Sequence, residues 1–204
     1  MIEAQRKTVS FDEFVAWYPQ NSEHRYELHR GVIVEMPKPR GKHSEIAGFL
    51  NLEFGLQCRQ SESPCFVPRE AIVKPSRDET GYEPDIIVLD RDRVINEPRW
   101  DAESIITIGS SVRLIVEVVS TNWRDDYCMK AGDYEEMGIA EYWIVDYLGL
   151  GGRRFIGTPK QPTLSIYQLV DGEYQVRQFR GNESLVSLAF SNLDLTAEQV
   201  FQGS

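Results

Sequence analysis

The fold of this chain is constrained most strongly by residues 113–147, RLIVEVVSTNWRDDYCMKAGDYEEMGIAEYWIVDY. The apolar residues 114–119 predict a strand buried on both faces, and residues 124–137 predict a helix that ends at Gly138. Residues 141–146 predict a second buried strand. Strand, helix and strand in this order indicate a crossover that joins two parallel neighbours of one sheet.

Patterns on either side of this unit predict a single domain over residues 1–204. Hairpins are expected at residues 25–36, with a turn around residues 29–31, and at residues 163–186, with a turn at Asp171-Gly172. Helices are expected at residues 10–18, 43–59 and 193–201, and strands at residues 65–75 and 85–89. Residues 91–111 are polar and indicate an excursion between core strands. The predicted fold class is α/β with added β-hairpins.

The charge balance limits the function. The chain has 22 Lys and Arg against 32 Asp and Glu, a net charge of -10. Phosphate neutralisation supplies most nonspecific nucleic-acid affinity, so this balance argues against an avid DNA-coating protein but not against an enzyme. Basic residues are scattered at 6–7, 38–42, 91–93 and 153–160, and each group is most simply a solvated surface.

Hydropathy and cysteine content predict the compartment. The sequence has no run of 18 apolar residues and no apolar signal segment near residue 1, so neither a membrane span nor secretion is expected. Cys58, Cys65 and Cys128 form neither an even framework nor a C-x-x-C pair. They are expected to be reduced thiols in a cytoplasmic protein.

Two acidic residues in apolar strands carry the strongest functional signal. Asp85 begins the strand predicted at residues 85–89, and Glu117 interrupts the most hydrophobic run of the chain. A carboxylate in such a setting is costly unless it is paired or binds a cation. Oxygen ligands of this kind favour Mg²⁺ or Mn²⁺ over Zn²⁺. The alternatives are a salt bridge from Glu117 to Arg113 or a lysine, and a position at the rim for Asp85.

Three further residues are candidates for the same site. Lys130 lies on one helical stripe with Asp126 and Tyr134, and could point its ammonium at the two acids and stabilise charge on a phosphate. The simpler interpretation is an Asp126–Lys130 pair on a solvated face. Glu27 could add a carboxylate or be a surface acid. His43 opens a helix, where it could bind a phosphate of the substrate or only cap the helix.

These residues fall in motifs that resemble the Uma2 family, also called DUF820, of the PD-(D/E)XK nuclease superfamily. The matching motifs are RYELHRGVIVEM at 25–36, His43, PD at 84–85, EVVS at 117–120, D-x-x-x-K-x-x-x-Y at 126–134 and GIAEYWIVD at 138–146. The resemblance covers nearly the whole chain, and the combination of motifs is specific.

The resemblance implies a restriction-endonuclease-like core, with a mixed central sheet flanked by helices, and Mg²⁺-dependent cleavage of DNA. Asp85 and Glu117 would be the metal ligands, and Glu27 an additional acid of the active site. Val119 stands where the plain E-x-K form of the motif has lysine, and the Uma2-like pattern implies that Lys130 takes that role. Attack in line with the leaving group would leave a 5′-phosphate and a 3′-hydroxyl.

The prediction is therefore a cytoplasmic, Mg²⁺- or Mn²⁺-dependent endonuclease with DNA as substrate. A dimer would suit an enzyme that cuts both strands. One alternative is a nuclease fold without catalysis that acts as a DNA-binding or regulatory module, which the acidic charge and Val119 both favour. Another is a protein-interaction domain whose hairpin edges pair with a partner or a second copy.

Overall fold

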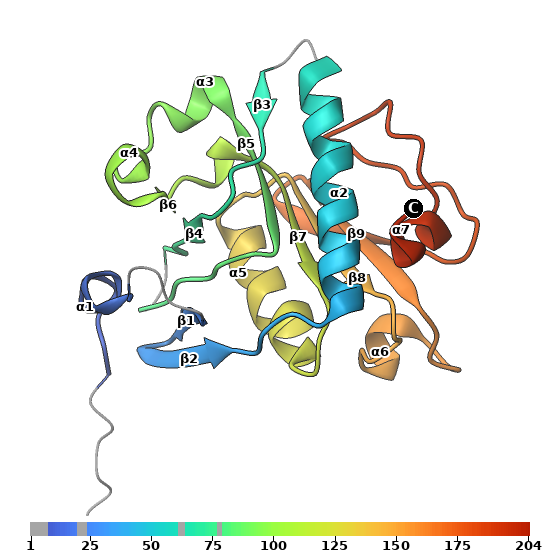
Figure 1. Cartoon of the computed structure of the whole chain (residues 1–204), viewed down its shortest axis with the longest axis horizontal. Helices are drawn as coiled ribbons and strands as arrows, with labels where there is room; N and C mark the ends of the chain where they lie inside the picture. The colour runs from blue at the N-terminus through green and yellow to red at the C-terminus, as the bar shows by residue number, and fades with distance from the viewer. Residues whose placement is uncertain (1–7, 20–23, 61–63, 77–78) are drawn as a thin grey trace, which may run out of the picture.

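A six-stranded mixed sheet forms the centre of the protein (Figure 1). The computed structural model describes residues 8–19, 24–60, 64–76 and 79–204, so the basic pair at residues 6–7 lies outside the described residues. The sheet has the order β10-β9-β8-β7-β5-β3. Its strands are β3 (Cys65–Phe66), β5 (Ile86–Asp90), β7 (Val112–Val118), β8 (Glu141–Asp146), β9 (Thr163–Val170) and β10 (Glu173–Phe179).

The predicted crossover is confirmed. β7 and β8 pair in parallel, with Glu117 opposite Ile144, and the other pairs in the sheet are antiparallel. Between β7 and β8 the chain forms one continuous helical segment, first a π-helix, η2 (Asp125–Lys130), and then an α-helix, α5 (Ala131–Glu136). Gly138 follows with a φ of 76°, which favours glycine, and the chain turns back into the sheet.

Alternating side chains give the sheet two buried faces. Leu114, Val116 and Val118 pack against α2 (Gly41–Gln60) and α7 (Ala197–Gln202). Ile115 and Val119 pack on the opposite face, against the side chains of η2 and α5. Both faces of β7 are therefore covered, which explains its continuous apolar sequence. Glu117 belongs to the second face by its alternation with Ile115 and Val119.

The N-terminal hairpin lies beside the sheet and is fastened to the chain just before β5. It consists of β1 (Arg25–His29) and β2 (Val32–Met36), joined by Arg30 and Gly31, both with positive φ. Leu28 of β1 exchanges backbone hydrogen bonds of 2.9 and 2.8 Å with Gly81. Helix α1 (Phe11–Trp17), which begins at the predicted cap Ser10, packs its Phe11 and Phe14 in one cluster with Leu28. This anchoring sets where the side chains of β1 point.

One prediction about the middle of the chain is wrong, whereas the excursion expected at residues 91–111 does lie between two core strands, β5 and β7. The single strand expected at residues 65–75 is instead β3 and a separate strand, β4 (Ile72–Val73), which pairs with β6 (Ile105–Ile106) in a small parallel sheet. The segment between β5 and β7 also contains short helices: α3 (Arg91–Val94), α4 (Trp100–Glu103) and η1 (Gly109–Ser111). Short α6 (Arg153–Ile156) precedes the second predicted hairpin, β9–β10, whose Asp171-Gly172 turn is confirmed.

The prediction of three reduced thiols is also wrong. Cys58, near the end of α2, forms a disulfide with Cys65 of β3, and Cys128 is free and exposed. The bond joins the end of a helix to an edge strand, a proximity that the spacing of the cysteines does not reveal. Cys58 and Cys65 are therefore not evidence for a reducing compartment. In the described part of the chain, no helix has the length and apolar character needed to cross a membrane.

Candidate active site

Asp85 and Glu117 lie side by side at one end of the sheet. In the antiparallel pair β5–β7, Ile86 is opposite Val116, so Asp85, the residue before β5, stands next to Glu117 and on the same face. The backbone N–H of Val118 donates to Oδ2 of Asp85 at 2.9 Å, which fixes this carboxylate against β7. The side chain of Glu117 is only 4% exposed. Two acids from different parts of the chain therefore share one buried position.

Lys130 points into the protein and contacts this acidic group. Its ammonium donates to Oε1 of Glu117 at 3.0 Å and to Oε1 of Glu27 at 2.9 Å, and lies 3.7 Å from Oδ1 of Asp126. The side chain is 1% exposed, so the interpretation of an Asp126–Lys130 pair on a solvated face is wrong. Among the described residues, the carboxylates within 4.0 Å of Lys130 do not include Asp85.

The helix that carries Lys130 has an unusual local form. Residues 125–130 form a π-helix with wider turns than the α-helix that follows. Asp126 and Lys130 both lie on its buried side, and one turn later Tyr134 places its hydroxyl 3.4 Å from Oε1 of Glu117. Short π-helical segments are frequent at functional sites. Here η2 and the following α5 together bring three polar side chains, Asp126, Lys130 and Tyr134, over Glu117.

Glu27 reaches the same cluster from the hairpin. It is fully buried, and Oε1 accepts hydrogen bonds from Lys130 and, at 3.1 Å, from the backbone N–H of Glu83. Its other oxygen lies 2.7 Å from Nε2 of His29. Burial opposes ionisation, but Lys130 and His29 outweigh it and lower the pKa of Glu27. Of the two interpretations of Glu27, the surface acid is therefore wrong, and Glu27 is a charged member of the buried cluster.

Asp85 is held by two cationic groups. Nη1 of Arg25 lies 3.1 Å from Oδ1, and Nε2 of His43 lies 3.2 Å from Oδ2. Burial alone would raise the pKa of Asp85, but His43, Arg25 and the N–H of Val118 lower it to about 2. Burial opposes the charged form of His43, whereas its contact with Asp85 raises the pKa of its imidazole. Asp85 is thus ionised at any ordinary pH.

Glu117 and Asp126 are in the opposite electrostatic state. Burial raises the pKa of Glu117 to about 7, and the charges of Asp85 and Glu27 add to burial while Lys130 opposes it. Burial likewise raises the pKa of Asp126 well above its usual range, with Glu117 and Asp85 contributing in the same direction. The carboxylates of the cluster therefore exceed what its buried cations neutralise.

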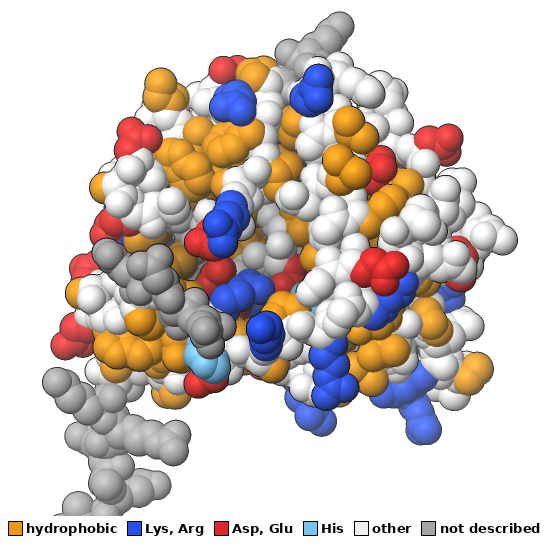
Figure 2. All heavy atoms as spheres, viewed as in Figure 1, with side chains coloured by type: hydrophobic (Ala, Val, Ile, Leu, Met, Phe, Trp, Pro, Cys, Tyr) orange, Lys and Arg blue, Asp and Glu red, His pale blue; other side chains and the backbone are white. Residues whose placement is uncertain are grey.

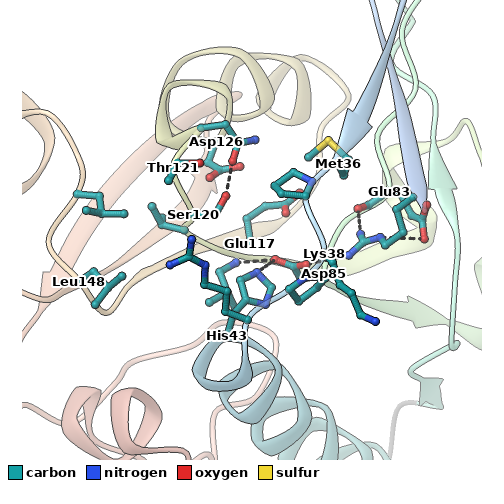
Figure 3. Close-up of a pocket in the computed structure, with 18 of the residues that line it drawn as sticks. Met36, Lys38, His43, Glu83, Asp85, Glu117, Ser120, Thr121, Asp126 and Leu148 are labelled. Atoms are coloured by element: carbon teal, nitrogen blue, oxygen red, sulfur yellow. Dashed lines mark hydrogen bonds and ion pairs between the residues drawn. The ribbon is translucent and has the colours of Figure 1, made fainter. Parts of the chain in front are cut away.

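These residues line a cavity of about 160 Å³, which is large enough for several water molecules. In Figure 2 acidic and basic side chains lie together in a hollow near the middle of the molecular face. Figure 3 shows His43 at the start of α2 directed at Asp85, with Glu117 behind them and Asp126 farther along the cavity wall. The loop between β2 and α2, which carries Lys38, also lines the cavity (Figure 3).

Sequence reasoning missed two members of this site. Arg25 contacts Asp85 and lies 3.2 Å from a carboxylate oxygen of Glu83, which in turn accepts from Tyr18 at 2.7 Å. Arg25 precedes Glu27 by two residues on the same strand, and residues two apart share a strand face. That spacing could have identified Arg25 once Glu27 was a candidate. The role of Glu83 could not be read in the same way, because it lies in a loop before β5.

The donor set is compatible with a small divalent cation. No group of three or more His, Cys, Asp or Glu side chains among the described residues forms a complete metal cage. Mg²⁺ typically takes only one or two protein carboxylates and keeps several waters. Hydrogen bonds to Glu117 converge on Oε1, leaving Oε2 without a donor in the described part of the chain. Burial is the largest cause of the raised pKa of Glu117, and the charges of Asp85 and Glu27 add to it, so a cation bound here would favour the ionised form of Glu117.

Val119 stands at the position where the E-x-K form of the motif has its lysine, and the surroundings of Val119 explain why a lysine does not fit there. Val119 is 1% exposed and packs among apolar residues that include Tyr127 and Ile144. It lies on the same side of the chain as Glu117, the side that η2 and α5 cover. A lysine there would have to run under this helical segment, whereas Lys130 enters from the segment itself and reaches Oε1 of Glu117.

Comparisons with known proteins agree with this architecture. The model of the Uma2 family, described as "Putative restriction endonuclease", matches residues 11–198. A solved structure described as a "putative nuclease belonging to DUF820 from Anabaena variabilis ATCC 29413" has a TM-score of 0.72 and 19% sequence identity, covering 96% of this chain and 98% of that chain. At this identity the likeness shows a shared nuclease-type fold. No curated protein matches the chain.

Proposed function

The chain belongs to the Uma2 family, and on that premise we propose that it is a Mg²⁺-dependent endonuclease that hydrolyses DNA phosphodiester bonds. The observation that carries the proposal is the convergence of Asp85, Glu117 and Lys130 at one cavity. Two neighbouring carboxylates and one buried lysine are the groups that such a hydrolysis requires. Asp85 directly precedes β5, Glu117 lies on β7 and Lys130 lies on η2. Tertiary packing, and not their spacing along the chain, brings the three side chains together.

Asp85 and Glu117 would hold the cation. When bound, the cation supplies Lewis-acid polarisation of a phosphate oxygen and lowers the pKa of a water nucleophile. Asp85 is suited to this role because its pKa of about 2 keeps it ionised. Glu117, with a pKa of about 7, is held partly protonated near neutral pH until a positive charge approaches. His43 and the Val118 N–H orient Asp85 through Oδ2.

Lys130 and Glu27 would act as a coupled pair. Although burial disfavours an ammonium, Glu117, Glu27 and Asp126 raise the pKa of Lys130 well above its ordinary value, so it remains charged. Glu27 fixes the ammonium through a 2.9 Å hydrogen bond and is itself fixed by the N–H of Glu83. In this role Lys130 stabilises negative charge that develops on the phosphate, and Glu27 positions Lys130. His43 would contact the substrate through the mouth of the cavity.

Cleavage of supercoiled plasmid DNA tests the proposal. The wild-type chain is expected to nick or linearise the plasmid with Mg²⁺ or Mn²⁺ and to be inactive with EDTA. Asp85→Asn and Glu117→Gln are expected to abolish the reaction while thermal unfolding remains cooperative. Products should be religated by a DNA ligase without further treatment, since the ends would be a 5′-phosphate and a 3′-hydroxyl. Equal cleavage by all three proteins would contradict the assignment.

A second candidate function is supported by the ion pairs themselves. Lys130 occupies one oxygen of Glu117, and Arg25 and His43 occupy both oxygens of Asp85. A site neutralised in this way would suit a nuclease fold that has lost catalysis and acts as a DNA-binding or regulatory module. Calorimetric titration separates the two candidates. Uptake of Mn²⁺ that Asp85→Asn eliminates favours the nuclease, and no uptake at all favours the inactive module.

A further inference from the structure

Two aromatic side chains stand beside the candidate active site. Trp123 lies just before η2 and Phe155 lies on α6, with their ring centroids 6.2 Å apart in an edge-to-face arrangement. The buried Tyr127 contacts both rings: it stacks on Phe155 at 4.8 Å and lies edge-to-face with Trp123 at 6.3 Å. Both Trp123 and Phe155 are only partly buried. They form the base of a surface at the end of the sheet that carries the cavity.

Basic side chains lie on these rings. The guanidinium of Arg124 is 4.8 Å from the centroid of Trp123, and that of Arg154 is 4.4 Å from the centroid of Phe155. The ammonium of Lys160 is 5.9 Å from Trp123. These cations and the neighbouring Arg153 are exposed. The ion pairs within 4.0 Å recorded for the described residues involve none of the four.

Contacts with the rings and with neighbouring groups hold Arg124, Arg154 and Lys160 in place. Gly152 lies against Trp123 so closely that a Cβ on Gly152 would be 3.0 Å from the indole. Nη2 of Arg154 also contacts Sγ of Cys128 at 3.2 Å, and the ammonium of Lys160 donates to the carbonyl of Leu150 at 2.9 Å. A guanidinium stacked on a ring keeps its N–H groups available in its own plane. Part of the entropy cost of binding an anion is thereby removed before the anion arrives.

The surface is continuous with the candidate active site. Leu150, which accepts from Lys160, lines the cavity, as does Asn122, which precedes Trp123. On another wall of the cavity, Lys38 and Arg40 of the β2–α2 loop are exposed. Figure 2 shows Lys and Arg side chains gathered in the lower part of the face, over the β2–α2 loop and around α6. The fold therefore collects cations around this cavity in a chain whose net charge is -10.

We propose that an aromatic–basic surface binds the backbone phosphates of DNA next to the bond in the cavity. Its cations, Arg124, Arg153, Arg154 and Lys160, contact the phosphates, and its rings, Trp123 and Phe155, position three of these cations. This inference rests on the proposed function, because it takes the substrate to be DNA. Guanidinium groups match phosphate geometry, and several cations on one surface supply affinity that does not depend on sequence. Anionic lipid would meet the same cations, but the surface leads into a cavity lined by acids, which a membrane cannot enter.

The test measures binding without cleavage. Fluorescence anisotropy of a labelled DNA duplex is recorded for the full chain across a salt series, with EDTA and in parallel with Ca²⁺. The triple variant Arg153→Gln, Arg154→Gln, Lys160→Gln is expected to bind more weakly. The slope of log affinity against log salt should fall by about one for each lost phosphate contact. The matched control is Arg91→Gln, which removes a guanidinium stacked at 4.5 Å on Phe66 near the other end of β5.

The outcomes separate this inference from the proposed function. The inference would be overturned if the triple variant had the same affinity and salt slope as the wild type. It would also be overturned if Arg91→Gln lost as much affinity as the triple variant, or if the wild type bound no DNA in either buffer. Binding to phosphatidylserine vesicles in preference to DNA, lost in the triple variant, would also overturn it. If the wild type binds DNA without cutting it, and the triple variant loses this binding, the proposed DNA-binding surface stands and the proposed nuclease activity is refuted. Glu117→Gln is expected to bind DNA at least as tightly as the wild type.

Discussion

Two of the networks around buried glutamates in the described part of the chain lie on opposite faces of the central sheet. Glu117 of β7 belongs to the face covered by η2 and α5. Glu141, the first residue of β8, alternates with Trp143 and Val145, which pack on the face covered by α2. Glu141 is fully buried and Glu117 is 4% exposed. By sequence both are acids in apolar strands, and burial does not distinguish them.

Their partners do distinguish them. Glu141 accepts hydrogen bonds from the Trp143 indole at 2.7 Å, the Ser187 hydroxyl at 2.6 Å, the Gln168 amide at 3.3 Å and the Leu188 backbone N–H. These donors are neutral, and they tie the segment after β10 to the sheet. Glu117 instead has a charged lysine, competing carboxylates and a cavity beside it. A buried acid whose hydrogen bonds are complete has a structural role, whereas an excess of charge next to a cavity indicates a reactive site.

The largest predicted difference between the Glu117 and Glu141 networks is in the rate of DNA cleavage. Glu117→Gln is expected to lower the rate of DNA cleavage by roughly a thousandfold or more, because cation-assisted stabilisation of the transition state is worth several kcal/mol. Asp85→Asn should do the same. Both variants keep the shape of the side chain, so circular dichroism should show unchanged secondary structure. A rate within tenfold of the wild type would remove the functional distinction between Glu117 and Glu141.

Removal of Lys130 should produce the largest loss of stability. Lys130→Met leaves Glu27 and Glu117 buried without their shared cation, which typically costs about 3–5 kcal/mol in free energy of unfolding. Denaturation in urea at neutral pH measures it. The control is Lys38→Met, an exposed residue whose replacement should change stability by no more than about 0.5 kcal/mol. Similar small losses in both variants would show that the cluster does not depend on its lysine.

Replacement of Glu141 should have an intermediate effect on stability and none on cleavage. In Glu141→Gln, the amide nitrogen meets donors such as the Ser187 hydroxyl and the Leu188 N–H, so at least one buried donor loses its acceptor. The expected cost is about 1–3 kcal/mol, measured by urea denaturation. Cleavage per folded molecule should equal that of the wild type. A loss of cleavage comparable to that of Glu117→Gln would mean that the networks are not functionally distinct.

The fold was predictable where local chemistry decides it. Arg30-Gly31 and Asp171-Gly172 have positive φ at both turn positions, as tight hairpin turns require, and both hairpins were predicted from these residues. The crossover followed from two apolar strands around a helix. The strand at residues 65–75 was wrong because its ends pair with different sheets, Phe66 with Leu89 and Ile72 with Ile105. Pairing at such distances along the chain leaves no local signal.

The site was predictable in its residue types but not in its geometry. Asp85 and Glu117 were identified because a carboxylate in an apolar strand needs an explanation. The direction of Lys130 was not decided by its spacing from Asp126, since residues four apart share a face whether that face is buried or exposed. Arg25 contacts Asp85, which lies 60 residues farther along the chain, through the docking of a hairpin. Such contacts depend on tertiary packing that periodicity cannot encode.

The last predicted difference concerns the pH dependence of stability, to which the neighbours Glu117 and Asp85 contribute in opposite directions. The pKa of Glu117 is raised to about 7 in the folded protein, so the folded state binds a proton that the unfolded state releases at lower pH. Its contribution therefore lowers the free energy of unfolding as pH rises from about 4.5 to about 7, by at most about 1.4 kcal/mol per unit. The pKa of Asp85 is lowered to about 2, so its contribution is lost as pH falls from about 4 to about 2.

Urea denaturation of the metal-free protein across pH measures both contributions. Relative to the wild type, Glu117→Gln should gain stability as pH rises from about 4.5 to 7, because the amide does not titrate. Asp85→Asn should show a smaller gain in that range, because the charge of Asp85 adds to burial in raising the pKa of Glu117, and it should lose less stability than the wild type on acidification toward pH 2. In the Glu141 network the donors that surround the carboxylate are neutral, so Glu141→Gln breaks no ion pair. A stability difference between Glu117→Gln and the wild type that is constant from pH 4.5 to 7 would contradict the raised pKa of Glu117 and with it the electrostatic difference between the Glu117 and Glu141 networks.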